Sequence, residues 1–303
     1  MNLVLHMLKS LCLSIFALLV VVLIVLFPRK LDIGLQGYKM SASYHFSWSQ
    51  YADNITGFLH GVFVDHTLGV TRYEEPIGAV VQTAIGKSLT IIVIGFLLSS
   101  ILGVMKGLAD YKLSKSKWNA IGNGTTWLFQ SVPDFMVVLL IQWFVIRYMP
   151  FIHFFEQKEW YAFLIPSVLV SIYPAMYIAR ITSAAIAGQE GQMYIQVAKA
   201  KGVAERMILY KHVGRNSLGT ILSHLPSLFG YLLSNLLMVE YLMSYPGAAY
   251  RLFQAIDYDT SFGSGENYEP GVIIGIACCF MIMIVLVQWI SFIAKRSVTP
   301  RSR

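Results

Sequence analysis

The stretch that decides how this sequence is organised is YIQVAKAKGVAERMILYKHVGRN, residues 194–216. Five of its residues are lysine or arginine, and only Glu205 is acidic. It lies between two apolar blocks, at about 161–179 and 221–244, each long enough to cross a membrane as a helix. We call residues 194–216 the basic segment. Its role depends on which side of the membrane it faces.

The composition is that of an integral membrane protein. The 303 residues are 56% hydrophobic and 13% charged, whereas soluble domains are about 25% charged. The apolar residues form six runs of spanning length, at about 11–27, 88–105, 126–146, 161–179, 221–244 and 272–294. The first run also resembles a secretory signal, but it ends in FPRKLD without a small-residue cleavage site. We therefore expect an all-α membrane protein, a single domain over 1–303 with six transmembrane helices.

The distribution of charge predicts the orientation. If the N-terminus is cytoplasmic, the inner segments hold 15 of the 23 lysines and arginines and only three acidic residues. Positive residues stay on the cytoplasmic side during insertion, so we expect both termini and the loop at about 180–220 to be cytoplasmic. The long outer segments, 28–87 and 245–271, show no strand or helix periodicity that would build a core of their own.

The basic segment has a helical pattern that is interrupted in the middle. Gly202 costs a continuous helix about 1 kcal/mol relative to alanine, so we expect two short helices joined at a turn. The apolar stripe at helical spacing consists of Met193, Val197, Ala200, Ala204, Met207 and Ile208. Contact with anionic lipid is one interpretation. The small residues on this stripe permit a close approach of another backbone, which favours docking into a groove on a protein partner.

The basic segment resembles the cytoplasmic loop of ABC-transporter permeases of the dipeptide/oligopeptide/nickel family. The resemblance rests on Tyr194, Ala198, Lys199, Ala200, Lys201, Gly202, His212, Arg215, Asn216 and Ser217. Four further stretches resemble family motifs in the family's order: LGVTRYEEPI (68–77), SVPDF (131–135), YIARITSAAI (177–186) and MVEYLMSYPGAAYRL (238–252). The chain has Gln196, Val197 and Ala198 in place of the general Glu-Ala-Ala, and Ala249 in place of the last glycine of Pro-Gly-x-Gly.

This resemblance implies a type I ABC importer-like permease that forms half of a translocation pore and docks an ATPase through a cytoplasmic coupling helix. The implied coupling residues are Tyr194, Gln196, Ala198, Lys199, Ala200, Lys201, Gly202, Glu205, His212, Arg215 and Asn216. The implied partners are a second homologous permease, two cytoplasmic ATPase subunits that bind ATP and Mg, and an extracytoplasmic substrate-binding protein, in a bacterial inner membrane. The expected cargo is an oligopeptide or dipeptide, with nickel or a metal chelate as the alternative.

The chain offers little chemistry of its own. The string AIGKSL (84–89) resembles the end of a phosphate-binding loop, but Val81 stands where that motif needs its first glycine. The seven histidines show no metal-site spacing, and His60 and His66 fit a surface pair better than a metal site. We therefore expect no enzyme activity, cofactor, metal or nucleic acid. Two other classes stay open, an ATP-independent channel or carrier and a membrane-anchored scaffold that binds lipid.

Four residues are candidates for the pore or for helix packing. Asp134 and Glu240 fall in expected spans, where an acid is costly unless it faces water or a partner. Asp134 is expected about two turns from the inner end of the third span, and Glu240 near the outer end of the fifth. They either line the passage or hold helices in register, or else they reach the interface or bind neighbouring backbone. The resemblance favours Glu240, together with Pro246 and Gly247 of the same family stretch.

Overall fold

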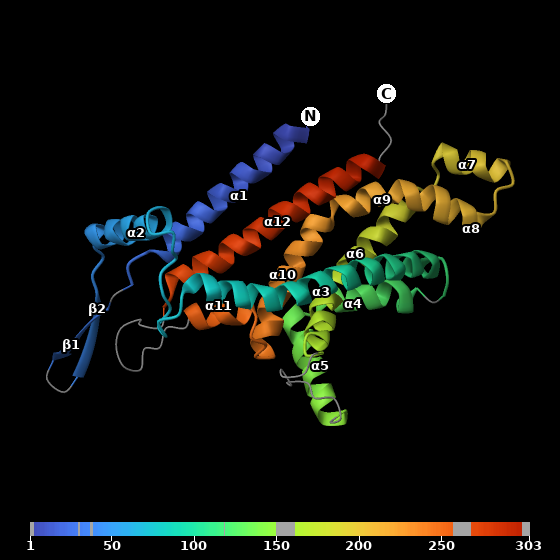
Figure 1. Cartoon of the computed structure of the whole chain (residues 1–303). Coiled ribbons are helices and arrows are strands. Elements are labelled where there is room, and N and C mark those ends of the chain that lie inside the picture. Colours follow the sequence, from blue (N-terminus) through green and yellow to red (C-terminus); the bar gives the residue numbers. More distant parts are fainter. Residues whose placement is uncertain are drawn as a thin grey trace. The chain divides into compact units, whose positions relative to one another are not determined.

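The computed structural model describes residues 3–29, 31–36, 39–117, 119–149, 161–256 and 268–298 (Figure 1). These residues are mostly helical, with one β-hairpin. The chain divides into two compact units, which we describe separately. The first unit consists of Met1–Leu89 and Pro246–Val285, and the second of Thr90–Tyr245 and Leu286–Arg303.

The first unit contains regular structure in both long segments between expected spans. Its elements are α1 (Leu3–Val25), β1 (Leu31–Gln36), β2 (Lys39–Tyr44), α2 (Trp48–Phe63), the start of α3 (Ile77–Ser114), α11 (Ala248–Ile256) and the start of α12 (Pro270–Val298). β1 and β2 pair antiparallel, with Leu31 opposite Tyr44. Ser47 caps α2 by accepting a hydrogen bond from the Gln50 backbone N–H at 3.4 Å. The expectation of no helical or strand pattern in 28–87 and 245–271 is therefore wrong.

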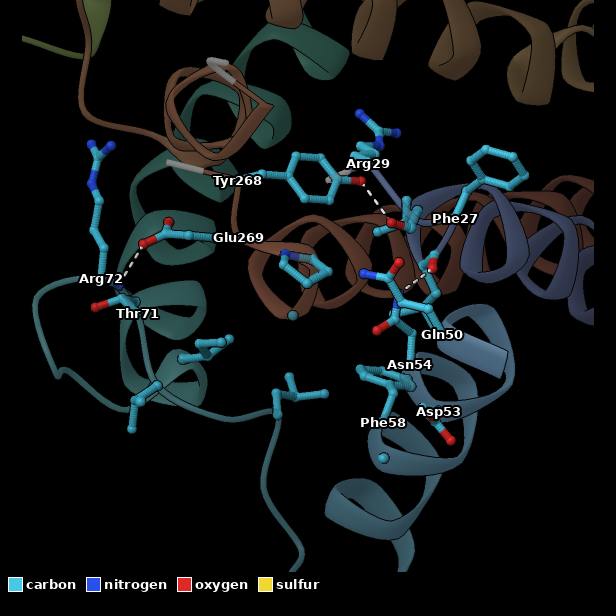
Figure 2. A pocket seen from close by; sticks show the side chains of 18 residues that line it. Phe27, Arg29, Gln50, Asp53, Asn54, Phe58, Thr71, Arg72, Tyr268 and Glu269 are labelled. Carbon is cyan, nitrogen blue, oxygen red and sulfur yellow. Dashed lines mark hydrogen bonds between the residues drawn. The ribbon is translucent and has the colours of Figure 1, made fainter. Parts of the chain in front are cut away.

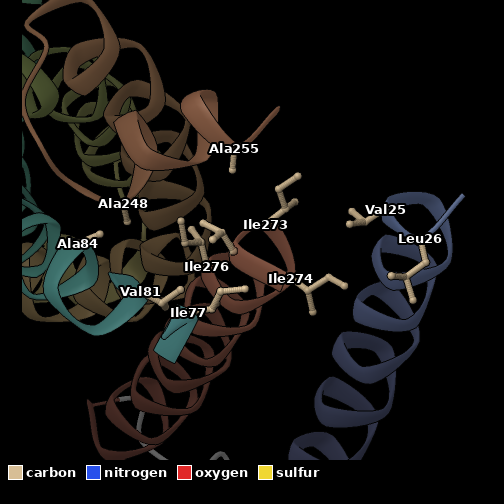
Figure 3. Packing of buried hydrophobic residues seen from close by; sticks show 11 residues of the cluster. Val25, Leu26, Ile77, Val81, Ala84, Ala248, Ala255, Ile273, Ile274 and Ile276 are labelled. Atoms are coloured by element: carbon tan, nitrogen blue, oxygen red, sulfur yellow. The ribbon is translucent and has the colours of Figure 1, made fainter. Parts of the chain in front are cut away.

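The reason for this error is visible in how α2 packs. Its apolar face is narrow, with Tyr51, Ile55 and Phe58 at helical spacing among polar residues. These three side chains pack against a cluster of buried aliphatic residues. The cluster joins four helices of this unit (Figure 3) through Val25, Leu26, Ile77, Val81, Ala84, Ala248, Ala255, Val272, Ile273, Ile274 and Ile276. α11 is further fixed to α3 because the Ala248 backbone N–H donates to Ser88 Oγ at 2.7 Å.

The second unit holds the remaining helices. They are the rest of α3, the π-helical turn η1 (Ala120–Gly124), α4 (Thr125–Ser131), α5 (Asp134–Tyr148), α6 (Leu164–Ala187), α7 (Met193–Ala200), α8 (Glu205–Met207), the π-helical turn η2 (Ile208–Val213), α9 (Gly214–Ser223), α10 (Leu225–Leu242) and the end of α12. α6 and α10 pack together, with Tyr177, Ile178 and Leu228 buried between them. This pair forms the centre of the second unit.

Two glycines on α3 allow a close approach to α6. A Cβ atom built on Gly103 would lie 2.7 Å from the Ala175 carbonyl oxygen, and one on Gly107 would lie 2.6 Å from Thr182 Cβ. The four-residue spacing is the GxxxG pattern that lets membrane helices pack backbone to backbone. Our sequence reading missed this pattern, although both glycines lie in or beside the second expected span.

The described residues include five helices that are long and apolar enough to cross a membrane: Met7–Val25, α3, α6, α10 and α12. A sixth span arises if the helices Ala120–Ser131 and Asp134–Tyr148, which meet at a bend of 103°, are counted together. Six spans therefore agree with the expectation, but the third is broken. Val132 is extended and Pro133 lacks an N–H, so the helical hydrogen bonding stops at that point.

Candidate coupling surface and passage residues

The basic segment folds as two helices joined at a turn, as predicted, but only the first is short, because α8, η2 and α9 follow one another without a break from Glu205 to Ser223. α7 ends at Ala200, and α8 begins at Glu205 and continues into η2. Gly202 has a φ of +74°, in the left-handed region that glycine adopts without strain. Its N–H donates to the Lys199 carbonyl at 2.9 Å, and the Val203 N–H donates to the Ala198 carbonyl at 3.1 Å. A glycine is therefore needed here for the turn.

The segment is anchored through one face only. Ala198, Ile208 and Val213 are buried against Ile186 near the end of α6, and Leu108 of α3 packs against the same cluster. The apolar stripe expected from the sequence lies mostly elsewhere. Met193 is 82% exposed, and Val197 and Met207 are each 53% exposed. The stripe predicted for docking, apart from Ile208, is thus open on this chain.

Polar contacts tie the basic segment and the turn before it to the end of α3. Glu190 lies between α6 and α7. Its Oε1 pairs with Lys115 Nζ at 2.6 Å and accepts a hydrogen bond from the Tyr111 hydroxyl at 2.7 Å. These two hydrogen bonds lower the pKa of the Glu190 carboxyl, and the same carboxylate raises the pKa of Lys115. Lys112 Nζ donates to the Tyr210 hydroxyl at 2.7 Å and lowers the pKa of that phenol. No local pattern in the sequence links these partners.

The other predicted coupling residues lie on or beside α7 and η2. The Tyr194 hydroxyl donates to Gln189 Oε1 at 2.9 Å, and Gln196 Nε2 donates to the Gly191 carbonyl at 3.2 Å. Both contacts hold the start of α7 locally. An exposed ion pair of 3.7 Å joins Lys199 and Glu205 across the turn. The remaining members are exposed, except for the half-buried His212: Ala200, Lys201, Arg215 and Asn216.

A buried charged group near the end of α3 was also missed by the sequence reading. Asp110 is fully buried and pairs with Lys106, one turn earlier on the same helix. Thr126 of α4 donates its hydroxyl to Asp110 Oδ2 at 2.5 Å, and Lys106 Nζ donates to the Gly122 carbonyl at 3.0 Å. This network fastens η1 and α4, the first half of the broken span, to α3.

The pore candidates do not form one cluster. Asp134 is the first residue of α5, at the break in the third span, and its Oδ1 accepts the Phe135 N–H at 2.8 Å. The expectation of a position two turns inside a continuous span is therefore wrong, because SVP interrupts the helix. Glu240 is completely buried in α10. Pro246 and Gly247 belong to the first unit, where they line a cavity of about 640 Å³ between α3 and α11.

A second cavity in the first unit, of about 700 Å³, is lined by residues of α1, α2 and the stretches beside α3 and α12 (Figure 2). Asn54 Nδ2 donates to the Leu26 carbonyl at 3.1 Å, and the Tyr268 hydroxyl donates to the Val25 carbonyl at 2.9 Å. Glu269 pairs with Arg251 and accepts the Arg72 backbone N–H at 2.9 Å. These polar groups are engaged within the chain, so they join its segments and leave few free contacts for a ligand.

The comparisons with known proteins define the class. Residues 95–300 match the model of the family described as binding-protein-dependent transport system inner membrane component. The chain therefore belongs to this family, and the resemblance inferred from its motifs is confirmed. It is a multi-pass membrane protein of the permease type.

Its relatives include peptide permeases. It is 25% identical over 193 residues to a protein of Brucella abortus named as a peptide transport system permease, covering 60% of this chain and 61% of that one. It is 27% identical over 198 residues to the dipeptide transport system permease protein DppB of Bacillus subtilis, covering 61% and 60%. The chain thus spans about three fifths of the length of these relatives.

The fold matches a solved transporter subunit. A chain of the inward-facing MetNI methionine ABC transporter superposes with a TM-score of 0.59 at 16% identity. The match covers 75% of this chain and 99% of that one. At this identity the likeness establishes the fold alone, and it supports the type I importer-like architecture expected from the sequence.

Proposed function

We propose that this chain is the transmembrane permease subunit of an ATP-driven ABC importer and docks a cytoplasmic ATPase through the basic segment. The observation that carries the proposal is the one-sided burial of that segment. Ala198, Ile208 and Val213 hold it to the spans, while Met193 and Val197 on α7 project from the chain. Apolar side chains beside lysines and arginines suit a groove with an apolar floor on a protein partner.

The anchoring contacts supply a route for mechanical coupling. Ile186 belongs to α6, and Leu108 and Tyr111 belong to α3, so a displacement of α7 acts directly on two membrane helices. An ATPase that binds α7 differently in its open and closed states would bias the arrangement of these spans. Coupling of this kind requires that the segment move as one body. The contacts of Glu190 and Tyr210 with the end of α3 favour this.

Peptides are the proposed cargo. The support comes from the relatives, which are named as peptide, dipeptide and glutathione transport permeases. Nickel or a metal chelate is the second candidate within the same family. The proposed assembly contains a second permease, two ATPase subunits that bind ATP and Mg, and an extracytoplasmic binding protein. This chain would contribute half of the passage, without catalysis or a cofactor of its own, in a bacterial inner membrane with both termini cytoplasmic.

The experiment that tests the proposal is purification of the tagged chain in mild detergent, with copurifying proteins identified by mass spectrometry. The test variant is Gly202→Asp, and the matched control is Gly191→Asp. Both glycines have positive φ, +74° and +82°, and a Cβ at either position meets no atom within 4 Å. The two variants therefore carry a similar backbone strain, but only Gly202 lies in the turn of the basic segment.

We expect the wild type and Gly191→Asp to retain an ATPase and a second permease, and Gly202→Asp to lose the ATPase while remaining in the membrane. A wild-type chain that purifies alone in several detergents would refute the docking role. An ATPase that is retained equally by Gly202→Asp would refute the assignment of the docking site to this turn.

A further inference from the structure

The exposed face of the membrane helix α10 is unusual in its chemistry. Its members recur at helical spacing and are mostly small or polar: Ser227, Gly230, Tyr231, Ser234, Met238 and Tyr241. The opposite face is buried and mainly aliphatic, with Leu228, Leu232 and Leu236 completely inaccessible. α10 thus presents two different surfaces, one to the protein and one to its surroundings.

The exposed face of α5, in the same unit, provides the contrast. Before the exposed Arg147 and Tyr148 at its end, its members are large and apolar: Phe135, Met136, Leu139, Leu140, Trp143, Phe144 and Ile146. A surface of this kind suits contact with lipid chains, which offer no hydrogen bonds. The exposed face of α10 has few large apolar side chains, so contact with lipid chains is less favourable there.

The hydroxyl groups on α10 lead to the same conclusion. The buried Ser167 and Ser171 of α6 donate to carbonyls of their own helix, Phe163 at 2.7 Å and Val168 at 2.7 Å. Among the residues that the structure describes, the hydroxyls of Ser227, Tyr231 and Ser234 have no such partner. A hydroxyl without a partner is unfavourable in hydrocarbon, so these three groups favour a polar neighbour such as water or a polar solute over lipid chains.

The ring of Tyr231 is supported from one side by α6. Its centroid lies 5.6 Å from that of Tyr173 and 4.8 Å from that of Tyr177. The Tyr177 hydroxyl is itself hydrogen-bonded to His224 Nδ1 at 2.9 Å, which fixes the supporting ring. Tyr231 remains 41% exposed. It therefore presents a positioned ring and a free hydroxyl on the same face as the two serines.

We propose that this face of α10 lines the water-filled passage, and that Ser227, Tyr231 and Ser234 contact the backbone of the transported peptide. A hydroxyl both donates and accepts, so it can pair with either the N–H or the C=O of a peptide bond in any register. Contacts of this kind tolerate many side chains. The inference rests on the proposed function and deepens it, because it names the surface that meets the cargo.

The test uses cysteine accessibility in the assembled transporter, reconstituted in lipid vesicles. Cys12, Cys278 and Cys279 are first replaced by serine, and Ser234→Cys is then introduced, with Leu139→Cys on α5 as the lipid-facing control. The probe is a charged, water-soluble methanethiosulfonate. We expect Ser234→Cys to react and Leu139→Cys to stay unmodified. The dipeptide alanylphenylalanine should slow the reaction at Ser234→Cys several-fold.

A second variant examines the hydroxyl by itself. Tyr231→Phe keeps the ring against Tyr173 and Tyr177 and removes only the hydroxyl, so the apparent affinity for the dipeptide should fall by up to about tenfold. An unchanged affinity would overturn the role given to this group.

Two other results would overturn the passage assignment. If the cysteine of Ser234→Cys does not react with the reagent, position 234 faces lipid. If it forms a disulfide with the same position in a second permease, position 234 lies in a helix interface. ATPase copurification is scored on the same preparations. If the ATPase is retained but Ser234→Cys is inaccessible, this inference fails while the proposed function stands.

Discussion

Replacing Gly103 with alanine tests how α3 and α6 are held together. The new Cβ would lie 2.7 Å from the Ala175 carbonyl oxygen and 2.8 Å from Ile178 Cβ. The first of these atoms is helix backbone and cannot swing away, so the two helices must separate. Overpacking of this kind typically costs about 1–3 kcal/mol. The loss should fall on the second unit, where both helices pack.

The matched control is Gly86→Ala on the same helix, where a Cβ meets no atom within 4 Å. Alanine favours a helix over glycine by about 1 kcal/mol at either position, so this contribution cancels in the comparison. The difference between the two variants therefore measures the clash alone, and we expect about 1–3 kcal/mol.

The assay is equilibrium unfolding of the purified full chain in detergent, by titration with SDS and near-ultraviolet circular dichroism. Gly103→Ala should unfold at a lower SDS fraction than Gly86→Ala. If the two variants agree within about 0.5 kcal/mol, α3 and α6 do not approach as closely as the structure has them, and the reasoning is refuted.

Two further perturbations concern charged groups of the second unit. Asp110→Asn leaves Lys106 without its buried partner and should lower the free energy of unfolding by about 3 kcal/mol. This value is at the low end for buried ion pairs because Lys106 is partly exposed. A loss of stability no larger than that caused by the exposed Asp65→Asn would contradict this prediction. Glu190 has a lowered pKa, so its contact with Lys115 stabilises the fold above the ordinary carboxyl pKa of about 4.3 and is lost as the pH falls through the lower native value. The SDS midpoints of wild type and Glu190→Gln should therefore converge below about pH 4, and a constant difference down to pH 3 would exclude the contact.

The helical class and the six apolar runs could be predicted because bilayer thickness imposes a length that hydropathy reveals. The ends of the helices could not. α3 continues to Ser114, beyond the expected end at 105, because the polar residues past the apolar run still favour a helix. The break at Pro133 could have been predicted from SVPDF, because a proline interrupts the hydrogen bonding of a helix.

For the candidate coupling surface, too, some features could be predicted from the sequence and others could not. The turn at Gly202 could be foreseen because a glycine inside a helical pattern marks an interruption. The face on which the segment is anchored could not, because the cluster that buries Ala198 includes residues of α3 and α6 that lie far away in the sequence. Apart from the pair Lys106–Asp110, which is one helical turn apart, the network around Asp110 and the contacts of Glu190 join residues between 15 and 80 positions apart. No periodicity reports such pairs.

The sparse burial of α1 has a consequence for how this protein can change over time. In its apolar stretch, Met7–Val25, only Ser14 and Val25 are buried within the chain, and the helix packs on the buried cluster of the first unit through its C-terminal end, at Val21, Val22 and Val25. Selection on this helix therefore acts mainly on its length and its hydrophobicity. Substitutions among aliphatic residues should accumulate there with almost no loss of stability. α10, by contrast, must satisfy a buried face and an exposed polar one at each turn. The two helices share one membrane, yet we expect the first to drift quickly and the second to be among the slowest parts of the chain to diverge.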